Sequence, residues 1–114
     1  MTQAQPELAV QPTLRTSGAL PASRPDTRLT GFAHRFETVN GVRLHYVTGG
    51  KIDGDTVVLL AGFPESWYAW RKVMPLLAER YKIVALDLPG QGDSDRPADG
   101  YDTQSLAVMV HGLL

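Results

Sequence analysis

A chain of 114 residues has room for one small domain, and its 11 basic and 12 acidic side chains leave a formal net charge of -1. Because positive and negative side chains are nearly equal in number, the chain has no net electrostatic attraction to nucleic acid or to an anionic membrane surface. We expect neither as a partner. The absence of cysteine excludes disulfide bonds, thiolate metal ligands and a cysteine nucleophile.

The first 31 residues differ in composition from the rest of the chain. They contain no aromatic residue but half of the eight prolines, namely Pro6, Pro12, Pro21 and Pro25. Such a segment cannot bury enough apolar surface to offset the entropy lost on ordering, so we predict a disordered leader over residues 1–31. One globular unit is expected over residues 32–114. A membrane span needs about 20 consecutive apolar residues, and no segment of the sequence has so many. There is also no apolar run typical of a secretory signal, so we expect a cytoplasmic protein.

A β-hairpin is predicted at the start of the globular unit. Strand-forming residues occupy positions 36–39 and 42–48, on either side of Asn40-Gly41. This dipeptide suits a type I′ turn, in which both central residues need a positive φ. The apolar residues do not alternate strictly, so the pattern leaves the register open. Residues 49–55 are expected to form a loop.

Two short apolar runs predict parallel strands farther along the chain. Residues 56–60 and 82–86 lack polar alternation, which is typical of strands covered on both faces. Between them, spacings of three, four and three predict one helical face made of Trp67, Trp70, Met74 and Leu77. Pro75 cannot lie deep inside a helix, so we expect a turn first and a helix that is kinked or restarts near the proline. Strand, helix and strand make a βαβ unit.

A last helix is predicted near the end of the sequence, after a loop rich in Gly, Asp and Pro over residues 88–101. Asp102 or Thr103 is suited to cap its N-terminus. The buried face is expected to comprise Leu106, Met109, Val110 and Leu113.

The segment Gly62-Phe63-Pro64 is the strongest candidate for a functional site. It follows directly on the run 56–60 and thus presents the backbone N–H of Phe63 at a carboxyl strand end, where open α/β sheets bind ligands. A backbone donor held there stabilises an oxyanion by about 3 kcal/mol. The alternative is an ordinary turn stiffened by proline, and the residues alone leave both readings open. Glu65 and Trp67 are candidates to line a pocket, although Trp67 fits the core more readily.

Asp87 and the three histidines are the other residues considered as nucleophiles or metal ligands. Asp87 stands at the carboxyl end of the second parallel run, and we favour a turn-forming carboxylate over a nucleophile or a metal ligand. His34, His45 and His111 lack metal-ligand spacing and are expected to be structural or surface residues. Ser94 is not in a G-x-S-x-G elbow, because Arg96 holds the last position. We expect no metal and no cofactor, and assign no catalytic residue.

Four sequence motifs in order resemble the N-terminal part of α/β-hydrolase fold enzymes, especially the epoxide hydrolase and haloalkane or haloacetate dehalogenase group. They are Asn40-Gly41-Val42-Arg43-Leu44-His45-Tyr46, Gly62-Phe63-Pro64-Glu65-Ser66-Trp67-Tyr68-Ala69-Trp70-Arg71, Asp87-Leu88-Pro89-Gly90-Gln91-Gly92-Asp93-Ser94 and Tyr101-Asp102. The resemblance covers residues 32–114. It implies the α/β class with a hairpin, then a βαβ unit with parallel strands in an incomplete sheet.

The resemblance also implies roles for the turn. Phe63 would donate its N–H to the oxyanion hole, across a cis Phe63-Pro64 bond. Many haloalkane dehalogenases have asparagine after the glycine, so Phe63 favours epoxide or ester chemistry, although haloacetate dehalogenases share the phenylalanine. The family usually has histidine before the glycine, and Ala61 in its place is expected to loosen the bonding that braces the turn.

The family's nucleophile, cap, orienting acid and base histidine match no residue of this sequence. We therefore expect a truncated epoxide hydrolase-like enzyme that is inactive alone, or a fragment of a serine esterase or dehalogenase of the same fold. A small-molecule epoxide, ester or organohalide would be the substrate of a complete enzyme only. The alternative of another class is a non-catalytic remnant that binds a partner through an exposed strand edge.

Overall fold

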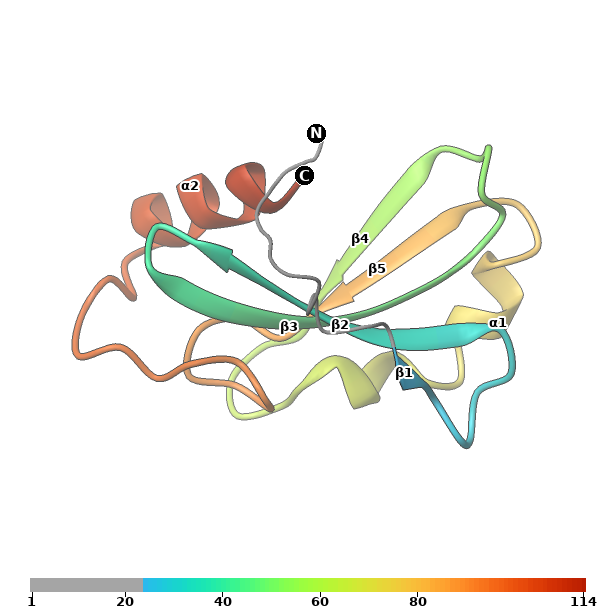
Figure 1. Cartoon of the computed structure of the whole chain (residues 1–114), viewed down its shortest axis with the longest axis horizontal. Helices are drawn as coiled ribbons and strands as arrows, with labels where there is room; N and C mark the ends of the chain where they lie inside the picture. Colours follow the sequence, from blue (N-terminus) through green and yellow to red (C-terminus); the bar gives the residue numbers. More distant parts are fainter. Residues whose placement is uncertain (1–23) are drawn as a thin grey trace, which may run out of the picture.

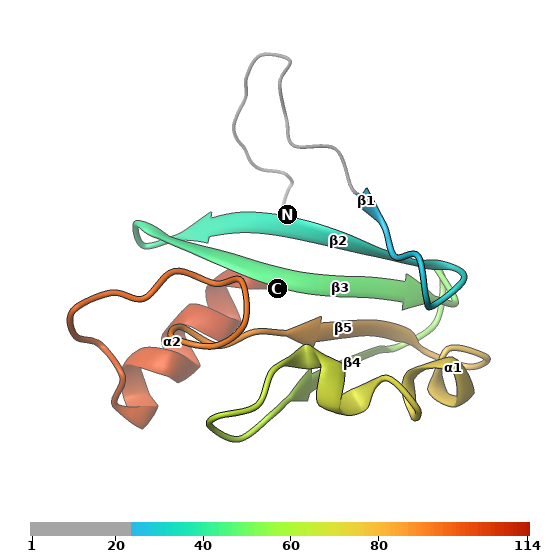
Figure 2. The ribbon, with the colours of Figure 1, turned by 90° about the horizontal axis from the view of Figure 1, so that it is seen from below.

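The computed structural model describes residues 24–114, which form a mixed five-stranded sheet with short helical segments on both faces (Figure 1). The strands are β1 (Arg24–Pro25), β2 (Phe32–Val39), β3 (Val42–Gly50), β4 (Thr56–Leu60) and β5 (Lys82–Leu86). Their order is β1-β2-β3-β5-β4, and Figure 2 shows β5 between β3 and β4. Only β4 and β5 are parallel. The predicted α/β class with a hairpin and a βαβ unit is therefore confirmed.

The hairpin turn has the predicted conformation. Asn40 and Gly41 have φ angles of 51° and 80°, as a type I′ turn requires. Because the loop has only two residues, Val39 pairs with Val42, and the pairing continues to Phe32 opposite Gly49. The turn thus determines the register that the apolar pattern left open.

The crossover between β4 and β5 consists of two short helical pieces. A 3₁₀ helix, η1 (Trp67–Trp70), begins after Ser66, whose hydroxyl accepts the N–H of Tyr68 at 3.3 Å. A separate helix, α1 (Met74–Leu77), has Pro75 in its first turn, where a missing N–H is tolerated. The prediction of a turn followed by a helix that restarts near the proline is confirmed.

Two apolar clusters lie on opposite faces of the sheet, because successive side chains of a strand point to opposite sides. One cluster contains Phe32, Val47, Leu59, Trp67, Met74, Ile83 and Ala85, and the crossover helices cover it. The other contains Leu44, Leu86 and Met109 and is covered by α2 (Thr103–Leu113), which Figure 1 shows on the other side of the sheet. Asp102 caps α2 by accepting the N–H of Ser105 at 3.0 Å, as predicted.

The start of the ordered unit differs from the expected boundary at residue 32. Residues 1–23 of the predicted leader lie outside the described residues. Residues 24–31 are ordered: β1 pairs with β2, and the side chain of Asp26 is buried. Composition misses this order because the segment is held by contacts with distant parts of the chain: the pairing of β1 with β2, the hydrogen bond of Asp26 with His34 and the packing of Leu29 against the core. None of the helices in the described part has the length and apolar character needed to cross a membrane.

Candidate functional site

The turn after β4 presents an open backbone surface. The N–H of Glu65 donates to the Gly62 carbonyl at 2.8 Å, and the Phe63-Pro64 peptide bond is cis. The N–H of Phe63 donates to no group among residues 24–114, and the Phe63 side chain is 85% exposed. A Cβ atom at Gly62 would meet no atom within 4 Å. The turn is therefore accessible to a ligand that approaches the Phe63 N–H.

Gln91 braces the residue before this turn. Its Nε2 donates to the carbonyl of buried Ala61 at 2.9 Å, and its Oε1 accepts the N–H of Leu88 at 3.1 Å. Gln91 is itself buried, so both ends of its amide are used inside the protein. Gln91 thus fixes the carbonyl of Ala61, and the expected loosening at Ala61 stays a prediction.

Asp87 holds the other side of the turn. Its Oδ1 accepts the N–H of Trp67 at 2.7 Å, and its Oδ2 accepts from His45 Nδ1 at 2.7 Å and from the N–H of Asp93 at 3.1 Å. Burial by itself would raise the pKa of Asp87, but these hydrogen bonds outweigh burial and lower the pKa below its ordinary value. The preferred prediction of a turn-forming carboxylate is confirmed.

The loop after β5 packs tightly around this carboxylate. Gly92 has a φ of 46°, and a Cβ atom there would collide with the Asp87 carboxyl group. Ser94 is almost fully buried; its hydroxyl donates to the Asp87 carbonyl at 2.6 Å and accepts the N–H of His45 at 2.8 Å. Ser94 is thus a structural residue and is not accessible as a nucleophile.

A chain of buried polar side chains extends from Asp87 across the hairpin. His45 Nε2 lies 2.8 Å from His34 Nδ1, and His34 Nε2 lies 2.8 Å from Asp26 Oδ2. Both histidines are structural, as predicted, and His111 lies exposed on α2. The sequence reasoning missed the partners of these two histidines. The two-residue turn was a usable signal, because the register that it sets makes His34 and His45 diagonal neighbours on one sheet face.

The two candidate pocket residues have different environments. Glu65 is exposed beside the turn, and its role as a lining residue stays a prediction. Trp67 is only 6% exposed and packs in the core, which is the reading that the sequence favoured over a pocket-lining role. Its backbone N–H donates to Asp87 at 2.7 Å, which fixes the start of η1 beside the loop after β5.

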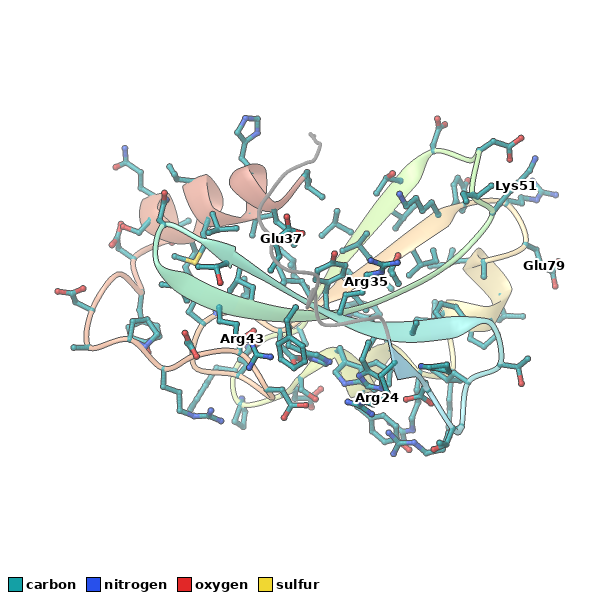
Figure 3. All side chains as sticks on the ribbon, viewed as in Figure 1. Arg24, Arg35, Glu37, Arg43, Lys51 and Glu79 are labelled. Atoms are coloured by element: carbon teal, nitrogen blue, oxygen red, sulfur yellow. The ribbon has the colours of Figure 1, made fainter. Side chains whose placement is uncertain are left out.

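A groove in the described part of the chain lies away from this turn. It has a volume of about 560 Å³ and is lined by the sheet face beside α2, including Arg35, Tyr46, Val58, Val84 and Leu113. Figure 3 shows Arg35 over the middle of the sheet, between α2 and β4. Within residues 24–114, no group of three or more potential metal-ligating side chains gathers in one place. The groove is thus separate from the turn.

Comparisons with known proteins agree with this architecture. The family model for the alpha/beta hydrolase fold matches residues 55–114. The soluble epoxide hydrolase of Corynebacterium sp. (strain C12) is 46% identical over 85 residues, covering 75% of this chain and 29% of that protein. The crystal structure of Cfl2 from Burkholderia cenocepacia is 70% identical with a TM-score of 0.80, over 82% of this chain and 32% of that one. A haloalkane dehalogenase variant, DbeA-M1 from Bradyrhizobium elkanii, is 32% identical with a TM-score of 0.68, over 74% and 28%. The chain spans less than a third of each of these proteins.

Proposed function

Because the chain belongs to the epoxide hydrolase-like group of the α/β-hydrolase fold family, we propose that it forms the N-terminal part of an epoxide-hydrolysing enzyme. In this proposal the Gly62-Phe63-Pro64 turn contributes one donor of the oxyanion hole. The observation that carries the proposal is the N–H of Phe63, which lies at the carboxyl end of β4 and donates to no group among residues 24–114. The space in front of Gly62 supports the close approach of a substrate oxygen.

The donor would act in the second half of the reaction. An aspartate of the complete enzyme attacks an epoxide carbon and opens the ring, which gives an alkyl-enzyme ester. Water activated by a histidine then attacks the ester carbonyl, whose oxygen gains negative charge. The Phe63 N–H would donate to that oxygen, a contribution of about 3 kcal/mol to the barrier. The braces from Gln91 and Asp87 support this role, because a donor stabilises a transition state best when it is held in place beforehand.

By itself the 114-residue chain is expected to be inactive. None of its residues matches the family's nucleophile, orienting acid or base histidine, and it contains neither a G-x-D-x-G nor a G-x-S-x-G sequence. The second donor of the hole would be the N–H that follows the nucleophile. An oxyanion donor and a binding surface without these groups retain only a small part of the rate enhancement.

A chimera tests the proposal. Residues 24–114 replace the corresponding N-terminal part of the Corynebacterium epoxide hydrolase, and hydrolysis of styrene oxide is measured. We expect turnover by the chimera and none by the 114-residue chain. Phe63→Pro removes the N–H and should lower kcat about 100-fold or more, whereas Phe63→Ala keeps the N–H and serves as its matched control.

Two results would contradict this function. The first is a chimera that folds, by circular dichroism and thermal unfolding, but does not turn over the epoxide. The second is an equal loss of activity in the two Phe63 variants, since the side chain and not the N–H would then matter. Turnover of a phenyl ester or a chloroalkane in place of the epoxide would favour the esterase or dehalogenase alternative.

The alternative chemistries of the same fold differ in the nucleophile. Because the chain is structurally similar to a haloalkane dehalogenase, an organohalide is an alternative substrate of the complete enzyme. A serine esterase would share the same turn. Reading the coding DNA beyond codon 114 distinguishes them: a glycine-flanked aspartate supports the epoxide or organohalide reading, and a glycine-flanked serine supports the esterase.

A function of another class is favoured by the edge of the sheet. Among the described residues, β4 pairs only with β5, and its Leu60 is 43% exposed. An unpaired apolar edge of this kind is a template for strand addition by another polypeptide. Size-exclusion chromatography with cross-linking tests this alternative, which needs a complex of defined stoichiometry rather than heterogeneous association.

A further inference from the structure

We propose that the buried chain Asp26–His34–His45–Asp87 is a positioning network that holds one excess proton between its two imidazoles and keeps the Phe63 turn aligned. The proposal deepens, and rests on, the function proposed for that turn. Three side-chain contacts of 2.7–2.8 Å form the network. It runs from the segment before β2, across the hairpin, to the loop after β5.

The number of protons follows from the hydrogen bonds. Burial by itself would raise the pKa of Asp26, but the N–H of Arg28, His34 and the N–H of Leu29 lower it to about 2. The pKa of Asp87 is lowered too, so both end groups are carboxylates that only accept. Each carboxylate therefore requires an N–H from the histidine that it contacts.

The contact between the two rings requires a third proton. His34 Nδ1 and His45 Nε2 are 2.8 Å apart, and one of them must carry a hydrogen for the contact to be attractive. Two neutral imidazoles have only two N–H groups, whereas the network uses three. One ring is therefore an imidazolium, and its positive charge lies between two carboxylates.

The surroundings leave these carboxylates as the dominant charges. The guanidinium of Arg28 lies 3.6 Å from Asp26 and is largely exposed, on the same segment before β2. From η1, the uncharged ring of Trp67 packs edge-on against His34, with ring centroids 5.4 Å apart. From β2, Phe36 packs against His45 and carries the guanidinium of Arg43 on its ring. The loop after β5 contributes Asp87.

The proton is linked to the turn through Asp87. One oxygen of this carboxylate holds His45, and the other accepts the N–H of Trp67, a residue close after Pro64. Loss of the shared proton would leave two nitrogen lone pairs facing each other at 2.8 Å, and the rings would separate. A displaced His45 would release part of its hold on Asp87 and therefore on the segment that presents the Phe63 N–H.

Nitrogen-15 NMR on the histidine-labelled 114-residue chain tests the proton count. We expect three protected imidazole N–H protons from His34 and His45 at mildly acidic pH. Raising the pH should remove one of them, and the backbone amide of Trp67 should shift with the same midpoint. His111, exposed on α2, is the internal control without protection. If the chain alone gives a poorly dispersed spectrum, the same spectra are recorded on the chimera.

Variants far from the turn test the positioning role. In the chimera, Asp26→Asn removes one carboxylate while it preserves the shape of the side chain. We expect its kcat to fall about tenfold with KM unchanged, because the imidazolium loses one of the two carboxylates that hold it. Asp26→Glu should restore most of the loss, and His111→Gln should match the unmodified chimera.

The possible failures are distinguishable. Only two imidazole N–H protons, or a Trp67 amide that does not respond when the third is lost, would overturn the network. An Asp26→Asn variant that loses stability but keeps its kcat, or one that Asp26→Glu does not rescue, would also overturn the positioning role. An inactive chimera whose NMR spectra show three protons and the coupled Trp67 shift would instead count against the proposed function alone.

Discussion

Replacement of Asp87 by asparagine should destabilise the protein strongly although it hardly changes the volume of the side chain. The carboxylate accepts three hydrogen bonds, from His45 and from the N–H groups of Trp67 and Asp93, and it is fully buried. An amide offers one acceptor oxygen. If that oxygen keeps the Trp67 N–H, the amide NH₂ group faces the other two donors.

The magnitude follows from the donors that lose their acceptor. A hydrogen bond to a charged group contributes about 1.5–3 kcal/mol, and a buried donor without a partner costs about 1–3 kcal/mol. Two buried donors that lose their acceptor at position 87 thus predict a decrease of about 3–5 kcal/mol in the free energy of unfolding. This is the range found when one partner of a buried ion pair is removed. This is a large share of the about 5–15 kcal/mol that stabilises a typical domain.

Urea unfolding, followed by tryptophan fluorescence, measures this change. We expect the midpoint to fall with an unchanged slope, the sign of lower stability without a change in compactness. Asp99→Asn, at an exposed position, is the matched control and should stay within about 0.5 kcal/mol of the original chain. A loss below about 1 kcal/mol for Asp87→Asn would show that the carboxylate does not hold its three donors.

Three further predictions concern the braces, the sheet edge and acid pH. Gln91→Ala leaves the carbonyl of Ala61 and the N–H of Leu88 without partners and should cost about 2–4 kcal/mol in urea unfolding; an unchanged midpoint would disprove the brace. Leu60→Lys places a charge on the β4 edge and should raise the monomer fraction in light scattering, and equal association would exclude this edge as the contact. The pKa of Asp26 falls from 3.8 to about 2 on folding, so its contribution is present above pH 4 and is lost as pH falls toward 2. In Asp26→Asn the free energy of unfolding should therefore change less between about pH 4 and pH 2. An identical pH dependence in the variant and the original chain would contradict the lowered pKa of Asp26.

The hairpin and the crossover show how far local rules reach. Asn40-Gly41 predicts its own turn because few residue pairs accept two positive φ angles, and the turn then sets the register. Pro75 likewise predicts the break between η1 and α1, since a proline is tolerated only in the first turn of a helix. In both cases the conformational preferences of one or two residues are sufficient to predict the local structure.

Asp26 and Gln91 show where those rules stop. Asp26 lies in a segment whose composition is typical of disorder, yet the segment is ordered by its pairing with β2 and by the buried contact of Asp26 with His34. Gln91 lies in a glycine-rich loop and donates to the carbonyl of Ala61, which lies after a different strand. Neither contact can be read from neighbouring residues, because each depends on which strands become adjacent.

Sequence patterns alone were enough to predict the hairpin, the two parallel strands, the helix restart, the cap of α2 and the position of the turn at a carboxyl strand end. These features depend on backbone preferences and apolar patterns within a few residues. The buried chain of Asp26, His34, His45 and Asp87 is visible only in the folded protein. Hydrogen bonds act over about 3 Å, so side chains distant in sequence meet only after the order and register of the strands have placed them together.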